Sequence, residues 1–205
     1  MAGKTSPARP VPAAQTDRPD QLLDIAARQF RARGYAAVSL RDIATEAGIR
    51  PPSLYYHFPS KDDLVMAVMD RGIAVVHRAV AAALEDLPAD ANPATRLETA
   101  MRAHLQALHG ASDYTSANVR IFGQLPEALR RANLPARRAY QAIWADLLAP
   151  TCGADASVLT ARVAFVIGAL NATLEWGDPA RIGIEALADQ VTQVLLQGLV
   201  PQGDA

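Results

Sequence analysis

Hydrophobic residues recur along most of this chain at spacings of three and four, which is the pattern of helices that bury one face. The first such run extends from residue 20 to residue 33, where Leu22, Ala26 and Phe30 share a face. Gly34 follows at the point where helices commonly end in a left-handed residue. The pattern therefore predicts an N-terminal amphipathic helix that ends at about Arg33.

Two shorter helices are predicted next. Ser39 can cap the first of them, with Asp42 three positions later in a weak version of the capping box. Gly48 supplies a tight turn, and the second helix opens at Pro51 and Pro52, whose missing amides cost little in a first turn. Two short helices joined by such a turn form a helix-turn-helix, whose second helix reads DNA in the major groove. Double-stranded DNA is therefore the expected partner of this segment.

The rest of the pattern predicts a helical body. Ser60 can cap a long helix that starts at Lys61 and continues to about Leu84. Three further helices and a loop are predicted after it: from about Thr95 to His109, from Tyr114 to Phe122, from Pro126 to about Leu148 with Pro135 as a point where it could kink, and a loop from Pro150 to Ala154.

The last two predicted helices differ in their apolar faces. The first, capped by Asp155 or Ser157 and ending at Gly177, carries apolar residues almost all round its axis, which predicts burial on more than one side. The second, from Ile184 to about Leu199, carries a single apolar stripe. Such a pair is what a two-fold homodimer interface requires. A single internal core without a dimer remains the alternative.

Composition favours closely packed helices and places any DNA contact locally. Of the 205 residues 50% are hydrophobic and only 5% are aromatic, and alanine supplies much of the apolar content. The formal net charge is -1, which does not by itself indicate a nucleic-acid-binding protein. From Arg18 to Lys61, however, seven basic residues accompany four acidic ones, so the helix-turn-helix is locally basic.

The remaining composition is typical of a cytoplasmic protein without a membrane segment. The single cysteine, Cys152, excludes an intramolecular disulfide. No early segment resembles a signal peptide, and the longest apolar run, Val163 to Leu170, is far shorter than the roughly 20 residues that a membrane span needs. Residues 1–17 and 201–205 are predicted to be tails, the first rich in proline and small residues.

The segment SLRDIATEAGIRPPSLYYHFPSKDDL resembles the N-terminal domain of the tetracycline-repressor (TetR) family of bacterial transcription regulators. The resemblance covers about residues 19 to 66 and includes the blocks Ile43-Ala44, Ala47-Gly48-Ile49, Leu54 to Phe58 and Lys61 to Leu64. It implies an all-α fold with an N-terminal three-helix helix-turn-helix DNA-binding domain at residues 18–64. A C-terminal helical domain for ligand binding and dimerisation would occupy residues 65–200.

The resemblance also implies a function and a set of DNA contacts. Family members bind a pseudo-palindromic operator as homodimers, most often as repressors, and a small apolar or amphipathic effector releases them. Arg41 matches a position that reaches a base edge or phosphate, and Ser53 matches a contact of the recognition helix. Tyr55 and His57 match a phosphate-binding pair, Lys61 matches a phosphate-binding lysine, and Tyr56 belongs to the same surface.

One departure concerns the start of the recognition helix. Family members commonly carry serine or threonine where this chain has Arg50, and a small or basic residue where it has Pro51. The change removes a side-chain cap and one base contact but adds a cation beside the groove. We therefore expect Arg50 to contact phosphate.

Polar and aromatic residues within the apolar helices of the body are candidates for an effector site, because such sites are mostly apolar with a few fixed polar groups. The candidates are His104, Tyr114, Asn118, Gln124, Tyr140, Trp144, Asn171 and Glu175. A body that serves only dimerisation or a protein partner, without a small ligand, remains the alternative function.

The sequence offers little support for an enzyme, a cofactor or a metal. His104 and His109 are five residues apart, so they do not share a helical face as metal ligands spaced by three or four would. No nucleophile and base pair, phosphate loop or dinucleotide fingerprint is present. We therefore expect no catalytic residues, no cofactor and no metal.

Overall fold

The computed structural model of the chain describes residues 18–110, 113–152 and 156–199, so the predicted tails lie outside the described residues. The described part is helical and contains no strand, which confirms the all-α prediction. The helices are α1 (Arg18–Arg33), α2 (Leu40–Glu46), α3 (Pro51–His57), α4 (Lys61–Glu85), α5 (Pro93–His109), α6 (Asp113–Ile121), the 3-10 helix η2 (Phe122–Gln124), α7 (Glu127–Cys152), α8 (Ala156–Trp176), α9 (Pro179–Ile182) and α10 (Ile184–Leu199).

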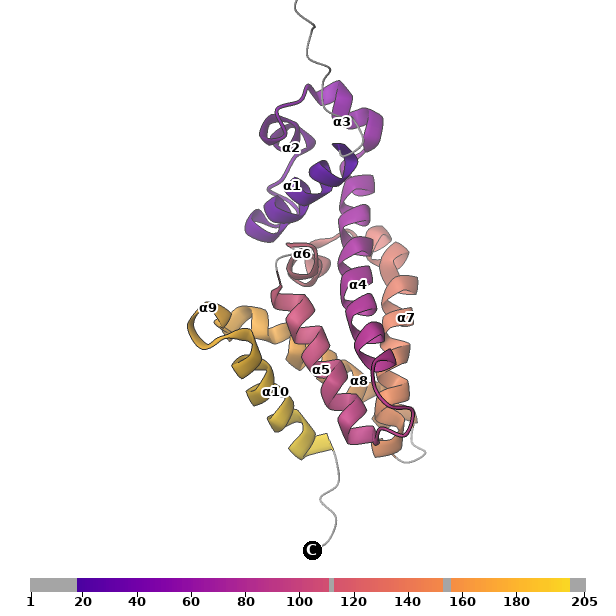
Figure 1. Cartoon of the computed structure of the whole chain (residues 1–205). Helices are drawn as coiled ribbons and strands as arrows, with labels where there is room; N and C mark the ends of the chain where they lie inside the picture. Colours follow the sequence, from indigo (N-terminus) through magenta and orange to yellow (C-terminus); the bar gives the residue numbers. More distant parts are fainter. Residues whose placement is uncertain (1–17, 111–112, 153–155, 200–205) are drawn as a thin grey trace, which may run out of the picture.

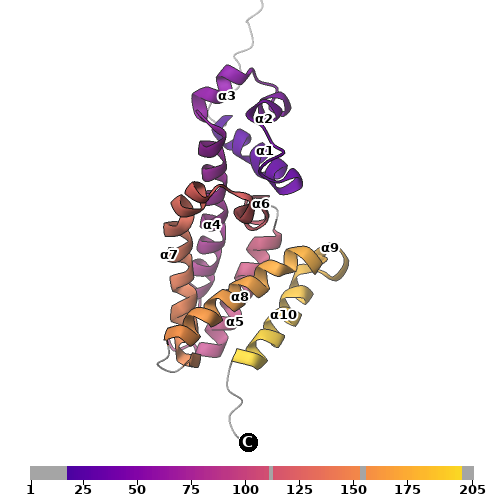
Figure 2. The same cartoon turned by 180° about the vertical axis from the view of Figure 1, so that it is seen from behind.

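The chain is elongated, with α1 to α3 at one end and the body below them (Figure 1). α4 runs from the N-terminal helices down through the body, with α7 alongside it in both views (Figures 1 and 2). α6 lies where the two parts meet, in contact with both α1 and α4. We call α1 to α3 the N-terminal unit and α4 to α10 the body.

The local signals read from the sequence are present in the N-terminal unit. Ser39 and Asp42 form the capping box of α2, in which the Ser39 hydroxyl accepts from the Asp42 amide at 3.2 Å. Gly34 and Gly48 adopt positive φ angles of 78° and 65°, a backbone region that glycine enters without steric cost. Ser60 caps α4 by accepting from the Asp63 amide at 3.1 Å. These contacts confirm the predicted helix boundaries.

The structure differs from the sequence-based reading at the end of α7 and after α8. Pro150 lies within α7, which continues to Cys152, so the predicted loop was wrong for residues 150–152; the rest of that loop and the predicted cap Asp155 lie outside the described residues. Pro135 also lies within α7 and is exposed. Because proline has no amide hydrogen, the backbone carbonyl four residues earlier lacks its usual helical donor and can bind water instead. The short α9 was not predicted; Asp178 caps it, and Gly183, with a φ of 80°, ends it.

α8 packs one face on the body and leaves the other face uncovered in the single chain. Its buried residues are Val163, Val166, Leu170 and Thr173, whereas Phe165 is 63% exposed. The burial on a second side that the sequence predicted is not present among the described residues of the single chain. α8 contains a window of mean hydropathy 1.5, and by length and composition alone it is the one helix in the described ranges that could cross a membrane. The same test is passed by core helices of soluble proteins.

The buried apolar residues form two clusters, one at each end of α4. The first combines the N-terminal unit, including Phe30, Ile43 and Leu54, with Tyr114 and Ile121 of α6. The second lies in the body, around Met101 and Trp144 in the described residues. Because α6 contributes to the core of the N-terminal unit, the two parts are packed together rather than merely linked. The domain limits given above stay predictions.

α4 and α6 approach each other closely at Gly72. A Cβ atom added there would lie 2.5 Å from the Tyr114 carbonyl oxygen and 2.9 Å from the Asn118 Cβ. Since the nearest of these atoms belongs to the backbone, it could not move aside without shifting α6. Gly72 is therefore what permits this helix pair to pack.

We expect Gly72→Ala to destabilise the protein by about 1–3 kcal/mol through overpacking, more than the roughly 1 kcal/mol that alanine gains in helix propensity. Chemical denaturation would measure the loss. Gly123→Ala is the matched control, because nothing lies within 4 Å of an added Cβ there. Equal stability of Gly72→Ala and the wild type would show that α6 does not need this close approach.

Candidate functional site

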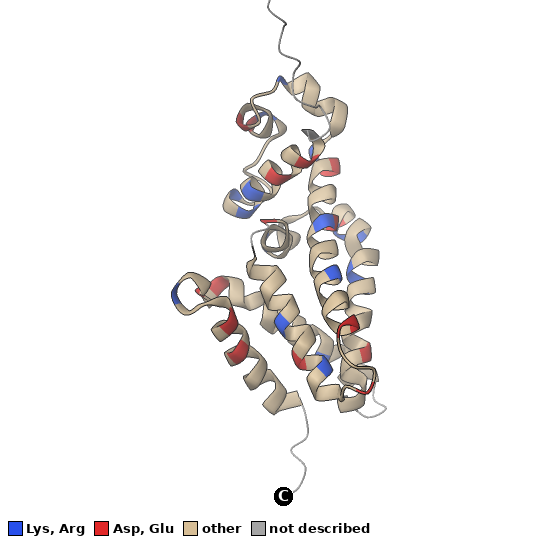
Figure 3. Ribbon diagram, in the orientation of Figure 1, with Lys and Arg blue, Asp and Glu red and all other residues tan. Residues whose placement is uncertain are grey.

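α3 presents an uncharged, exposed surface at the tip of the molecule. Leu54 is fully buried and holds the helix to the core, while Tyr55 and Tyr56 are exposed, Tyr56 to 86%. Ser53 and His57 are half-buried beside them. Figure 3 shows that α3 carries no lysine, arginine or acidic residue of its own. Any charge on this surface must come from the segments that flank the helix.

The three arginines of α1 that face outward are engaged within the protein. Arg28 pairs with Glu46, and Arg31 pairs with Asp113. Arg33 donates to the Ala37 carbonyl at 2.7 Å and lies 3.7 Å from the Asp42 carboxylate. These contacts hold α1 to α2 and to α6. These three arginines belong to the seven basic residues that make the segment locally basic, but their charges are engaged by acidic side chains.

Three cations around α3 have no ion pair among the described residues: Arg41 in α2, Arg50 before α3 and Lys61 after it. Arg41 and Arg50 are exposed. Arg41 and Arg50 precede the exposed tyrosines in the chain, and Lys61 follows them. This arrangement provides positive charge along an otherwise neutral helix, as a phosphate backbone requires.

Lys61 packs on the ring of Tyr35, a residue that the sequence analysis did not select. The Lys61 Nζ lies 4.1 Å above the Tyr35 ring, and the Tyr35 hydroxyl donates to the Asp62 Oδ1 at 2.8 Å. Partial burial lowers the pKa of Lys61, and burial together with the Asp62 contact raises the pKa of Tyr35 to about 12. The ammonium group is thus partly desolvated and oriented before any ligand arrives.

The start of α3 lacks a side-chain cap, as the sequence suggested. Arg50 occupies the cap position without a side-chain hydrogen bond to the helix, and prolines fill the first two helical positions. In this first turn the Ser53 amide donates to the Arg50 carbonyl at 2.9 Å. The Arg50 guanidinium is therefore free to reach outward.

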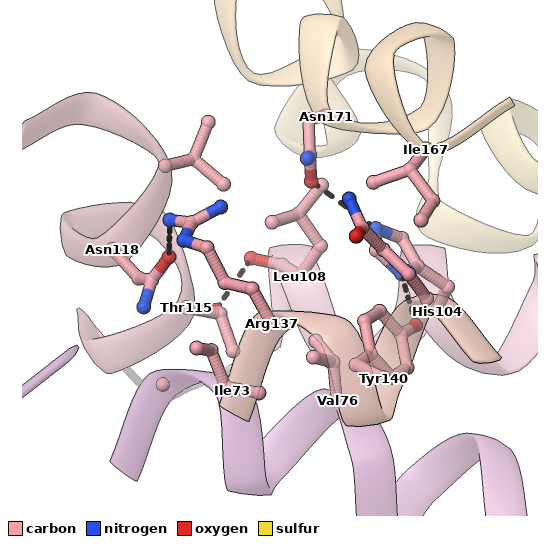
Figure 4. A pocket seen from close by; sticks show the side chains of 13 residues that line it. Ile73, Val76, His104, Leu108, Thr115, Asn118, Arg137, Tyr140, Ile167 and Asn171 are labelled. Carbon is pink, nitrogen blue, oxygen red and sulfur yellow. Dashed lines mark hydrogen bonds between the residues drawn. The ribbon is translucent and has the colours of Figure 1, made fainter. Parts of the chain in front are cut away.

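A cavity of about 60 Å³ lies within the body, between α4, α5, α6, α7 and α8 (Figure 4). Its walls combine aliphatic side chains with neutral polar groups, and Arg137 is the one formally charged side chain among them. The lining residues are Gly72, Ile73, Val76, His104, Leu108, Thr115, Asn118, Val119, Arg137, Tyr140, Gln141, Ile167 and Asn171.

One end of the cavity is closed by a neutral hydrogen-bonded group. The buried His104 ring makes contacts of 2.7 Å from Nδ1 to the Tyr140 hydroxyl and 3.2 Å from Nε2 to the Asn171 Oδ1. Since the amide oxygen can only accept, Nε2 carries the proton and Nδ1 accepts from Tyr140. Burial lowers the pKa of His104 to about 4 and raises the pKa of Tyr140, so both stay neutral. This end offers polarity without charge.

The other end holds Arg137, which the sequence analysis missed. Its Nη2 donates to the Asn118 Oδ1 at 2.7 Å, its Nε donates to the Asn133 Oδ1 at 3.1 Å, and its guanidinium lies 3.6 Å from the centre of the Phe122 ring. Burial lowers the pKa of Arg137 to about 10. Figure 4 shows Arg137 beside Asn118, while His104, Tyr140 and Asn171 gather at the opposite end.

Four of the eight candidate effector residues line the cavity, namely His104, Asn118, Tyr140 and Asn171. The other four lie elsewhere. Tyr114 donates to the Asp24 Oδ1 at 2.6 Å, and the Gln124 Oε1 accepts from the Tyr35 amide at 2.9 Å, so both join the body to the N-terminal unit. Trp144 is buried behind His104 and Tyr140, and Glu175 is exposed, 3.9 Å from Arg120.

The selection of polar and aromatic residues near apolar helices could not separate these two groups, because the sequence does not show which helices meet around the cavity. Arg137 was missed because it sits among Arg130, Arg131 and Arg138, where the sequence resembles a solvated helix face. A signal was nevertheless present: Arg137 lies three residues before Tyr140 and therefore on the same helical face.

Two family descriptions match this chain. Residues 22–68 match "Bacterial regulatory proteins, tetR family", and residues 90–199 match "Tetracyclin repressor-like, C-terminal domain". The second match alone covers more than half of the chain. The chain belongs to the tetR family of bacterial regulatory proteins. Membership of this family agrees with the expectation that the chain is not an enzyme.

The similar curated proteins of this family include the transcriptional repressor KstR2. The chain is 33% identical to KstR2 of Mycobacterium tuberculosis over 138 residues, which is 64% of each chain. It is 47% identical to KstR2 of Mycolicibacterium smegmatis over 58 residues, or 28% of each chain. These matches span less than two thirds of either relative.

Solved structures show the same fold. A structure of AibR in complex with isovaleryl coenzyme A and operator DNA superposes with a TM-score of 0.76, at 23% identity, over 87% of this chain and 98% of that one. The structure of the ketosteroid regulator KstR2 of Mycobacterium tuberculosis gives a TM-score of 0.74 at 22% identity, over 90% and 96% of the two chains. At these identities the likeness concerns the fold of this tetR-family chain.

The described ranges contain no group of three histidine, cysteine or acidic residues that could hold a metal ion. His104 and His109 diverge, since the Nε2 of His109 contacts the Thr173 hydroxyl at 2.8 Å and His104 faces Tyr140 and Asn171. Their imidazoles are thus committed to different partners.

The buried His104 makes the stability of this regulator depend on pH. The unfolded chain binds a proton at His104 with the ordinary pKa of 6.5, and the folded chain does so only near 4. Stability is therefore lost as the pH falls from about 6.5 to about 4, by roughly 3 kcal/mol for this group. We expect urea denaturation of His104→Gln to show a shallower fall over this window than the wild type.

His57→Gln, a change in the exposed α3, is the control for losing a histidine outside the cavity. Parallel pH curves for the wild type and His104→Gln would contradict the neutral, buried state of His104.

Proposed function

We propose that this chain is a ligand-responsive transcriptional repressor that binds a pseudo-palindromic operator as a homodimer and is released by a small effector. The observation that carries the proposal is the arrangement around α3. An exposed, uncharged helix is flanked by three cations that form no ion pair within the described ranges, and one continuous helix joins this unit to a body with a cavity. Repression is proposed because the similar KstR2 proteins are named as repressors.

The proposed DNA contacts use the exposed end of the N-terminal unit. The phosphate backbone would be held by Tyr55, His57, Lys61 and Arg50. The bases would be read by Arg41 and Ser53. Tyr56, the most exposed of the α3 side chains, would lie against the duplex. Because DNA lies in the cytoplasm of a bacterium, this function also places the protein there.

The proposed dimer uses α8 and α10. α10 packs on α5, and α8 packs on α5 and α7, which leaves a groove between α8 and α10 lined mainly by apolar side chains. Phe165, Trp176 and Val194 in this groove are 63%, 61% and 68% exposed. A contiguous apolar surface of this kind is typical of a protein interface. A second copy would supply the burial that the apolar pattern of α8 predicts.

The proposed response rests on the path from the cavity to α3. α4 lines the cavity with Gly72, Ile73 and Val76 and begins with Lys61 at the N-terminal unit. In a dimer, a tilt of α4 changes the separation of the two α3 helices. An effector can change the populations of the two tilts of α4 only if it binds them with different affinity. AibR, with the same fold, has been crystallised with both an acyl-coenzyme A and operator DNA, which supports two ligand sites on one such chain.

The DNA assignment is tested by selecting binding sequences for the wild type from a random duplex pool and measuring affinity at several salt concentrations. We expect Lys61→Ala to weaken binding similarly for all sequences and to reduce the salt slope by about 1, because it removes one phosphate contact. Arg41→Ala should instead lose about 1–3 kcal/mol of discrimination at one base pair.

Arg78→Ala is the matched control, since Arg78 is an exposed cation of α4 far along the helix from Lys61. If Lys61→Ala and Arg78→Ala bound the selected duplex equally well and with the same salt slope, Lys61 would have no phosphate contact. If no sequence were enriched, the proposal of an operator would fail.

The dimer is tested by light scattering after size exclusion. We expect the wild type to be a dimer and the double variant Phe165→Glu with Val194→Glu to be a monomer, because four buried carboxylates at a two-fold interface would lose hydration without partners. The monomer should bind the selected duplex far more weakly. Ala142→Glu, on the exposed side of α7, is the control. A wild type that is monomeric would refute this interface.

A further inference from the structure

Arg137 is a partly buried cation that faces the cavity without a carboxylate partner. Several other arginines of the body pair with acids: Arg71 with Asp20, Arg102 with Glu98 and Asp189, Arg120 with Glu175, and Arg131 with Glu127. In the part of the chain that the structure describes, the partners of Arg137 are two neutral amides and an aromatic ring. A desolvated charge without a counter-ion is costly, so an anion is the partner that this site lacks.

The geometry of Arg137 leaves room for that anion. Nε and Nη2 are used by Asn133 and Asn118, whereas Nη1 has no hydrogen bond partner among the described residues. The lining of the cavity contains no acidic residue that would repel an anion. Because His104 stays neutral at the far end, the charge of the cavity is that of Arg137 alone.

The space and its walls restrict the rest of the ligand. The cavity volume is about 60 Å³, well below the roughly 300–1,000 Å³ of sites for drug-sized ligands, so a small ligand is the better match. Between the two polar ends lie the aliphatic side chains of Ile73, Val76, Leu108 and Ile167. The planar guanidinium matches a carboxylate, and the remaining space suits a short hydrocarbon chain.

We propose that Arg137 binds the carboxylate of a short-chain aliphatic carboxylic acid whose hydrocarbon part fills the cavity between α4 and α8. This proposal deepens the proposed function, since it names the class of effector. It rests on that function only for the effect on DNA, because binding to the cavity can be measured without DNA.

The same contacts connect the anion to α4. Asn118 accepts from Arg137 and donates to the Met69 carbonyl oxygen at 2.7 Å. Asn133 accepts from Arg137 and donates to the Asp70 Oδ1 at 2.9 Å. A carboxylate bound by both Nη1 and Nη2 of Arg137 would draw Nη2 away from Asn118. Asn118 would then lose one of the two hydrogen bonds that fix it between α6 and α4. The effect of the anion thus reaches two consecutive residues of the helix that leads to α3.

Calorimetric titration of the full-length protein tests the site with butyrate and hexanoate, their neutral amides butyramide and hexanamide, and butyryl-coenzyme A. We expect the two carboxylates to bind the wild type and the amides to bind at least about tenfold more weakly, since a charge-assisted pair with Arg137 would be lost. Arg137→Gln should lose a similar factor for the carboxylates. It should leave the weak amide binding unchanged.

Two variants keep the test decisive. Arg138→Gln removes the adjacent, exposed arginine of α7 and should bind the carboxylates like the wild type. Arg137→Lys keeps the charge but not the planar fork and should bind more weakly than the wild type. Circular dichroism and thermal unfolding of each variant show whether it folds; a folded Arg137→Lys with reduced affinity supports the proposal even if Arg137→Gln does not fold.

The proposal is overturned if neither carboxylate binds the wild type, if the amides bind as tightly as the acids, or if folded Arg137 variants bind like the wild type. It is also overturned if butyryl-coenzyme A binds and the free acids do not, since the thioester has no carboxylate for Arg137. If the acids bind through Arg137 but leave affinity for the selected duplex unchanged, the site stands and the ligand response in the proposed function fails.

Discussion

The arrangement of this chain depends on the close packing of α6 against α4 at Gly72. At this point the absence of a side chain lets the Tyr114 carbonyl and the Asn118 side chain approach the α4 backbone. From there α6 and η2 reach the N-terminal unit, where Asp113 pairs with Arg31 and Gln124 accepts from the Tyr35 amide. A shift of α6 relative to α4 must therefore disturb either the cavity or the N-terminal unit, because α6 contributes to the walls of one and to the core of the other.

Burial has opposite consequences for the two ends of the cavity. An imidazole can lose its proton, so the desolvation of His104 is relieved by a lowered pKa and by two neutral hydrogen bonds. A guanidinium remains charged at any ordinary pH, even with its pKa lowered to about 10, so the cost for Arg137 is reduced only by amides and the Phe122 ring. The His104 end of the cavity is thus neutral and hydrogen-bonded, whereas the Arg137 end retains a charge without a counter-ion among the described residues.

Local signals in the sequence were sufficient for most of the helices and for the exposed surface of α3, although not for the end of α7 or for α9. The Ser39 capping box, the turn at Gly48 and the buried Leu54 depend on neighbours within a few residues, which the sequence displays directly. The cavity depends on which helices meet, and no local pattern states that. Asn118 and Tyr114 both lie on α6 and are both buried and polar, but one lines the cavity and the other bonds to Asp24. The pairing of Arg28, Arg31 and Arg33 was hidden for the same reason, since Arg31 finds Asp113 across 82 positions of sequence.

These pairings also change how the N-terminal unit would meet DNA. With the α1 arginines committed to Glu46, Asp113 and Asp42, the positive charge near α3 comes from Arg41, Arg50 and Lys61, one from each segment that borders the helix. α3 itself supplies no charge, and its first turn lacks a side-chain cap. Affinity for phosphate would then depend on how these three segments are held relative to one another. Because Lys61 is both the first residue of α4 and the cation packed on Tyr35, a tilt of α4 would move this proposed phosphate-binding group directly, and no separate relay through α3 would be needed.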